Sequence, residues 1–256
     1  LRDDSPTWWS QCAQINFELK NYERAFECFS RACELQPSDI ASYMGAARSA
    51  LALGREAEAE EKAISILRYD PTNYDALIVM AEIFERRNDV SNALLAYTQA
   101  ADHTANPIPA LLAKAKLLRA LKRSGEAITT LKRIVDLAPE DDEAAAQLGE
   151  ALAEANQGQD ALEAFQRAIQ IAPRKVAHYV RLGRLYRLTG QLDAALGHLQ
   201  HARELAPENA EALREMAFVF EGRRQFNRAY ELYQKLMALE PNNADNFFRA
   251  GLVLKE

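Results

Sequence analysis

The pattern of apolar and small residues along this chain repeats every 34 residues. The stretch YVRLGRLYRLTGQLDAALGHLQHA, from Tyr179 to Ala202, places Gly183 inside a helical run, although glycine costs a helix about 1 kcal/mol relative to alanine. Steps of 34 residues from this glycine always find alanine or glycine, at Ala13, Ala47, Ala81, Ala115, Gly149, Ala217 and Gly251. The recurrence indicates that a second backbone comes close to the helix at this position.

A second series of small residues lies further along each repeat. Its members are Ala25, Ala59, Ala93, Ala127, Ala161, Ala195 and Ala229. Large residues stand four positions before the first small residue in seven of the eight repeats, and four positions after the second in six of seven, as Tyr179 and Leu199 do. Large side chains beside small ones are the packing pattern of an antiparallel helix pair. Each repeat is therefore predicted to hold two helices.

Proline closes six of the seven complete repeats, at Pro37, Pro71, Pro139, Pro173, Pro207 and Pro241. Proline cannot continue a helix and disfavours helix in the residue before it, so these prolines are expected to end the second helices. Polar residues that follow, such as Asp39, Asn73 and Asn243, are expected to cap the next helix. The predicted repeats are 6–39, 40–73, 74–107, 108–141, 142–175, 176–209 and 210–243, followed by the first helix of an eighth over 244–256.

The sequence resembles the tetratricopeptide repeat (TPR) family over nearly its whole length. The family pattern W-x2-L-G-x2-Y…A-x3-F…P is matched best by Tyr179, Leu182, Gly183, Tyr186, Ala195, Leu199, Ala202 and Pro207. The resemblance implies an all-α fold, a right-handed α-solenoid in which residues 1–256 form a single superhelix without a domain boundary. It also implies that first helices line a concave face, that second helices line the convex face, and that the concave face binds peptides or helices.

Two regions depart from the regular pattern. The third repeat has Ala105 in place of the closing proline, and Lys114 occupies an apolar position of the fourth repeat, so we expect a different bend near Pro107. The last helix carries Phe247 and Leu254 at regular repeat positions without a second helix to cover them. We therefore expect either that the chain continues in a larger protein or that this face meets something else, including a second copy of the chain.

Composition narrows the function classes. The net charge of −6 argues against general binding to nucleic acid or to anionic membranes, and no run of 18 apolar residues is present to span a bilayer. The three cysteines, Cys12, Cys28 and Cys33, are too few for a disulfide framework and are expected to be reduced thiols of a cytoplasmic protein. Cys28 and Cys33 are predicted to point away from each other on one helix.

Motifs for catalysis, cofactors and metals do not occur in the sequence. Phosphate-binding, zinc-protease and nucleophile-elbow patterns are missing, so we expect neither an enzyme nor a cofactor. His198 and His201 lie on one helix face but have no third ligand nearby in the sequence, and they are expected to be solvated. His178 lies near a turn and is assigned no role.

The candidate site lines the presumed groove, at positions 5, 9 and 12 of the first helices, counted from the start of each repeat. The candidate residues are Met44, Arg48, Ile78, Glu82, Leu112, Lys116, Arg119, Glu150, Val180, Arg184 and Arg187. Position 5 is mostly apolar, which fits either packing between repeats or a hydrophobic floor for a ligand. Position 9 alternates in charge from Arg48 to Arg184, which fits either a ladder of ion pairs between repeats or a groove that selects charged ligands.

These observations predict a protein–protein interaction scaffold. The groove is expected to bind a peptide with an apolar anchor and acidic flanks near repeats four to six, so reversing the charges of Arg184 and Arg187 should abolish binding with little effect on melting temperature. Two alternatives stay open: a regulatory or substrate-docking arm of a larger enzyme, and an RNA reader, which the acidic balance disfavours. No first helix has the Lys-x3-Asn pair by which chaperone-binding members of the family hold a carboxylate, so that role is not expected.

Overall fold

The computed structural model describes residues 5–255, which form fifteen α-helices and no strand. The first helices of the repeats are α1 (Pro6–Glu18), α3 (Ile40–Ala52), α5 (Tyr74–Arg86), α7 (Ile108–Ala120), α9 (Asp142–Glu154), α11 (Val176–Leu188), α13 (Ala210–Gly222) and α15 (Ala244–Lys255). The second helices are α2 (Tyr22–Leu35), α4 (Glu56–Tyr69), α6 (Val90–Asp102), α8 (Ser124–Leu137), α10 (Gly158–Ile171), α12 (Leu192–Leu205) and α14 (Phe226–Leu239). The predicted all-α class is confirmed, and every first helix begins where a repeat was predicted to begin.

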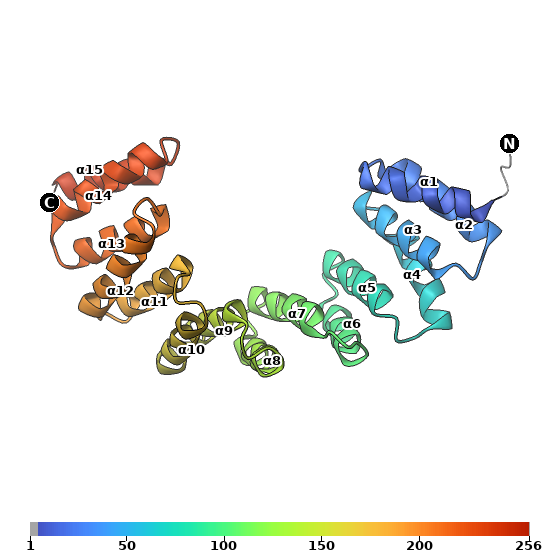
Figure 1. The fold of residues 1–256 in the computed structure, drawn as a ribbon, viewed down its shortest axis with the longest axis horizontal. Helices are drawn as coiled ribbons and strands as arrows, with labels where there is room; N and C mark the ends of the chain where they lie inside the picture. The colour runs from blue at the N-terminus through green and yellow to red at the C-terminus, as the bar shows by residue number, and fades with distance from the viewer. Residues whose placement is uncertain (1–4, 256) are drawn as a thin grey trace. The chain divides into compact units, whose positions relative to one another are not determined.

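The chain divides into two compact units, residues 1–120 with α1 to α7 and residues 121–256 with α8 to α15. Within each unit, consecutive helices pack side by side and reverse direction at each turn (Figure 1). The division falls between α7 and α8, inside the predicted repeat 108–141. Each unit is described here by itself, and one continuous right-handed superhelix stays a prediction.

Local sequence explains where the helices begin and end. Asp39, Asn73 and Asn209 accept hydrogen bonds from backbone amides in the first turns of α3, α5 and α13, which satisfies donors that a helix start leaves unpaired. Each first helix from α1 to α13 is followed, two residues after its end, by a residue with positive φ, at Lys20, Gly54, Asn88, Lys122, Asn156, Gly190 and Arg224. This left-handed residue turns the chain sharply into the second helix.

The end of the third repeat and the first helix of the fourth depart from the regular pattern. Without a closing proline, α6 ends at Asp102 and spans 13 residues, whereas the other second helices span 14. Lys114 of α7 places its Nζ 2.8 Å from Thr98 Oγ1 on α6. The lysine thus occupies an apolar repeat position by finding a polar partner on the neighbouring helix.

The close approach predicted at Gly183 is confirmed. A Cβ atom added there would lie 2.6 Å from Leu199 Cγ and 3.3 Å from the carbonyl oxygen of Ala195 on α12. Ala195 and Leu199 are fully buried, in the apolar core that joins α11 to α15. A side chain at position 183 would force Leu199 of the paired helix to move, which explains the glycine there.

Candidate functional site

The first helices of unit 1 form a cavity of about 420 Å³. Its lining residues are Gln14, Phe17, Phe29, Ile40, Ala41, Met44, Gly45, Arg48, Asn73 and Asp75. Two of the predicted groove residues, Met44 and Arg48, are among them. We call this surface the unit 1 cavity.

The unit 1 cavity combines apolar and polar walls. Phe29, from α2, is largely buried and comes so close to α3 that a Cβ at Gly45 would lie 2.4 Å from its ring. Arg48 Nη2 pairs with Asp75 Oδ1 at 2.6 Å, and both side chains remain about half exposed. Met44 is buried, whereas the guanidinium of Arg48 keeps free edges that solvent or a ligand can reach.

The other predicted residues of unit 1 lie on α5 and α7. Ile78 is half-buried and packs against Ala81 and Tyr97, so at this position the packing alternative holds. Leu112 and Arg119 are half-buried, and Glu82 and Lys116 are exposed. None of these residues lines the unit 1 cavity.

In unit 2, Arg184 and Arg187 are bound by carboxylates of the next repeat. The carboxylate of Glu215 on α13 accepts hydrogen bonds from Arg184 Nε at 2.6 Å and from Arg187 Nε at 2.8 Å. The Glu215 side chain is only 5% exposed. Arg184 Nη2 also pairs with Glu211 at 2.6 Å. The structure therefore changes the expectation that charge reversal at these two arginines would barely affect stability, because both hold a buried carboxylate in place.

In unit 2, ion pairs join position 9 to other positions of the neighbouring repeat. Glu150 pairs with Arg181 Nε at 2.9 Å, and Arg184 reaches Glu211 and Glu215. Val180 is 1% exposed within the core, so it cannot serve as an open apolar floor. In unit 2, the charged residues of position 9 thus form ion pairs between repeats rather than an open charged groove. Their partners, Arg181, Glu211 and Glu215, were not predicted from repeat position alone.

Position 6 of the first helices supplies the residues that sequence reasoning missed. Arg181, Glu215 and Arg249 occupy it in the last three repeats, where earlier repeats have no charged residue. Arg249 and Arg187 both approach the ring of Phe218, with guanidinium carbons 4.5 and 5.1 Å from its centre. The change at position 6, from uncharged residues to residues of alternating charge, could have predicted from the sequence that α11, α13 and α15 interact through charged side chains.

A further ionic cluster joins α9 to the start of α11. Lys175 Nζ lies 2.5 Å from Asp142 Oδ2, and Arg181 Nη2 lies 2.9 Å from Glu143 Oε1. The hydrogen bond from Lys175, followed by that from His178, lowers the pKa of Asp142, and the bond from Arg181 lowers the pKa of Glu143. His178 is fully buried with Nε2 2.7 Å from Asp142, which corrects the view that it has no role.

His198 and His201 pack on tyrosines. The ring of His198 stacks on Tyr186 at 5.4 Å, and that of His201 meets Tyr179 edge-on at 4.6 Å. His198 is half-buried rather than solvated, whereas His201 is exposed. Among residues 5–255, no cluster of three or more histidine, cysteine or acidic side chains is placed to hold a metal ion. No helix within that range combines the length and apolar character needed to cross a bilayer.

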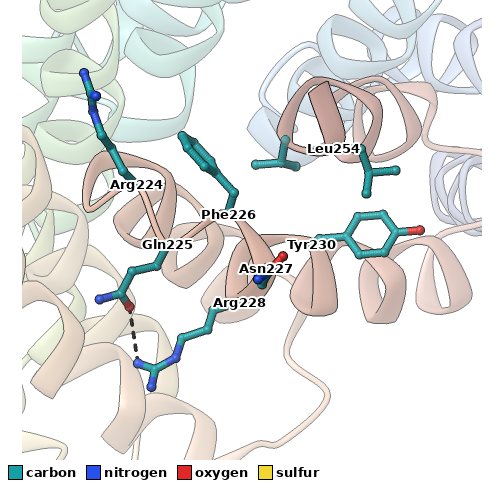
Figure 2. Close-up of a pocket in the computed structure, with 8 residues that line it drawn as sticks. Arg224, Gln225, Phe226, Asn227, Arg228, Tyr230 and Leu254 are labelled. Atoms are coloured by element: carbon teal, nitrogen blue, oxygen red, sulfur yellow. Dashed lines mark hydrogen bonds between the residues drawn. The ribbon is translucent and has the colours of Figure 1, made fainter. Parts of the chain in front are cut away.

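A second cavity, of about 490 Å³, lies between α14 and α15. Phe226 and Tyr230 of α14 and Leu254 of α15 line this cavity, and Gln225 accepts a hydrogen bond from Arg228 at its edge (Figure 2). Leu254 and Phe247 are 64% and 49% exposed on the face of α15 that earlier repeats cover with a second helix. This apolar surface was predicted from the last helix, although the cavity itself was not.

Tetratricopeptide repeat sequence profiles match residues 6–39, 44–107, 112–176 and 152–217. These segments cover more than half of the chain, so the chain belongs to the tetratricopeptide repeat family. DnaJ homolog subfamily C member 7 of Homo sapiens and of Mus musculus are each 30% identical over 119 residues. The match covers 46% of this chain and only 24% of those relatives' length.

Solved structures show the same fold. The C-terminal part of a TPR repeat-containing protein from Cytophaga hutchinsonii has a TM-score of 0.74 and 16% identity, and covers 93% of this chain and 97% of its own. A tetratricopeptide repeat protein from Parabacteroides merdae has a TM-score of 0.62 and 15% identity, covering 97% and 98%. A chain of the APC/C Cut9–Hcn1 hetero-tetramer has a TM-score of 0.57 and 18% identity, covering 94% and 51%. Repeat proteins of this family generally serve as scaffolds for protein interactions.

Proposed function

We propose that this chain is a non-enzymatic scaffold that binds an extended peptide or helix of a partner protein at the unit 1 cavity. The supporting observation is a concave surface where Phe17, Ile40 and Met44 lie beside the half-exposed Arg48. An apolar side chain of the ligand would enter the cavity, since burial of apolar surface is the main source of binding energy. A neighbouring ligand carboxylate would bind the guanidinium edges that Asp75 leaves open.

A displayed peptide library selected against the 1–256 chain tests this function. We expect enriched peptides with an aliphatic or aromatic residue next to an acidic one, and we expect Arg48→Glu to weaken a selected peptide about tenfold or more in fluorescence anisotropy. Arg31→Glu is the matched control, because Arg31 forms an exposed ion pair with Glu34 and does not line the cavity. Peptides that bind both variants as tightly as the parent chain would refute this placement of the site.

In this proposal, Arg184 and Arg187 of unit 2 stabilise the fold and do not bind the ligand. Arg184 and Arg187 fasten α11 to α13 through Glu215, and their charges are already matched. A guanidinium with edges open to an acidic ligand is therefore better supported at Arg48, whose pair with Asp75 is about half exposed and holds no buried carboxylate, than at repeats four to six.

We also propose that the 1–256 chain self-associates through α15. A Cβ at Gly251 would meet nothing within 4 Å, whereas at the equivalent Gly183 it meets Leu199 of the paired helix. Phe247 precedes Gly251 by four residues, so two copies of α15 packed antiparallel would each place a phenylalanine against the other's glycine. In a two-fold symmetric dimer, the large residue of each copy can pack on the small residue of the other. Two-fold symmetry is the symmetry of most homodimers.

A further inference from the structure

Two of the three cysteines meet across the first helix pair. Cys28 Sγ on α2 lies 3.7 Å from Cys12 Sγ on α1. Cys28 is fully buried and Cys12 is half-buried, whereas Cys33 lies five residues further along α2 and is 4% exposed. The two thiols that face each other therefore belong to different helices, and Cys12 is the more exposed of the two residues.

The small residues of the repeat bring these thiols together. Cys12 precedes Ala13, and Cys28 lies three residues after Ala25. Ala13 and Ala25 are fully buried, at the two positions where the backbones of a helix pair approach most closely. Asn16 Nδ2 donates a hydrogen bond to Cys12 Sγ at 3.6 Å and another to the carbonyl oxygen of Cys12 at 2.8 Å, so the neighbourhood of Cys12 is ordered.

We propose that Cys12 and Cys28 are a redox pair that closes into a disulfide between α1 and α2. A disulfide needs an S–S distance of about 2.0 Å, so small rotations of the two side chains must close a gap of roughly 1.7 Å from the observed contact. The oxidant is a low-molecular-mass disulfide such as oxidised glutathione, which can reach half-buried Cys12.

The reaction has two thiol–disulfide exchange steps. The Cys12 thiolate attacks oxidised glutathione, forms a mixed disulfide and releases one glutathione thiolate. The Cys28 thiolate then attacks Cys12 Sγ, forms the protein disulfide and releases the second glutathione. Two electrons pass to the oxidant, and the two protons of the protein thiols end on the two glutathione molecules. Burial raises the pKa of Cys28 to about 11, which agrees with Cys12 being the thiol that attacks the oxidant first.

The disulfide would tether the first helix of the chain. Among the described residues, α1 packs mainly on α2 and α3. A covalent link between Cys12 and Cys28 limits how far α1 can separate from α2, because it removes open conformations of the intervening chain. Amide hydrogen exchange over residues 6–35 should therefore slow in the oxidised form.

Equilibration of the 1–256 chain in glutathione buffers of increasing oxidised fraction tests the proposal. We expect the protein to lose the mass of two hydrogen atoms, the thiol count to fall from three to one, and peptide mapping to find Cys12 joined to Cys28. Cys12→Ser and Cys28→Ser should each abolish this mass change. Cys33→Ser is the matched control and should retain it. Circular dichroism checks that each variant folds, and if Cys28→Ser does not, Cys12→Ser at the more open site carries the test.

The outcomes that overturn the proposal are distinct. Three free thiols in the most oxidising buffer, a stable glutathione adduct without a cross-link, or a cross-link to Cys33 would each do so. The native fold should also accelerate the reaction, because it holds the thiols in contact. A Cys12–Cys28 link that forms only in denaturant would show that the folded helix pair does not bring them together.

Discussion

Reversing the charges of Arg184 and Arg187 should destabilise unit 2 strongly. In the Arg184→Glu, Arg187→Glu variant, the carboxylate of Glu215 stays buried, loses both of its cations and faces two new carboxylates. Glu211 loses its partner as well. The ring of Phe218 also loses one of the two guanidinium groups that lie near it.

The burial of Glu215 sets the magnitude. Removing the partners of a buried charge typically costs about 3–5 kcal/mol, because the remaining charge is left without water or a counter-ion. Arg184 is 40% exposed, so part of its attraction is screened, and we expect a total of about 3–5 kcal/mol rather than twice that. At roughly 2–4 °C per kcal/mol for a domain of this size, the melting temperature should fall by about 6 °C or more.

Thermal and urea unfolding, followed by circular dichroism, measure the effect. Arg48→Glu is the control, since it disrupts an ion pair whose members are both about half exposed and should cost less than about 1 kcal/mol. A triple variant, Arg184→Gln, Arg187→Gln and Glu215→Gln, should recover most of the loss because it removes the buried charge as well. A charge-reversed protein that melts within about 1 °C of the parent would refute the view that Glu215 depends on these arginines.

Three further results are expected. Gly183→Leu should destabilise by about 1–3 kcal/mol or more through collision with Leu199, whereas Gly197→Ala, where an added Cβ meets nothing within 4 Å, should be neutral or slightly stabilising in the same melts. Lys175 and His178 lower the pKa of Asp142 from 3.8. The contribution of Asp142 to folding stability should therefore be complete above pH 3.8 and lost as the pH falls through the lower pKa of the folded state. Acid titration followed by circular dichroism should show that the stability of Asp142→Asn depends less on pH in this range. Light scattering should show a concentration-dependent dimer of the 1–256 chain that Phe247→Glu abolishes, and a strictly monomeric parent would contradict the packing proposed for α15.

The exposed apolar face of α15 could be predicted from the sequence, whereas the ion pairs between repeats could not. Phe247 and Leu254 were expected to be uncovered because their repeat positions recur and their partner helix does not. The partners of Arg184 were not predictable in the same way. A long arginine side chain reaches several positions of the next helix, and only the rotation of α13 brings Glu211 and Glu215, rather than Phe218, to its guanidinium.

The sequence by itself determined the class of fold and the residues at which the first helices begin. A 34-residue period carries the same constraint many times, so the small residues around Gly183, the capping residues and the closing prolines together specify where helices begin and pair. Only the tertiary structure decided which side chains meet across those pairs. Whether Cys12 touches Cys28, and whether Val180 is buried or open to a ligand, depends on the angle at which each helix faces its neighbour. That angle is set by the packing of all the surrounding side chains at once, and it cannot be obtained from the spacing of residues along one helix.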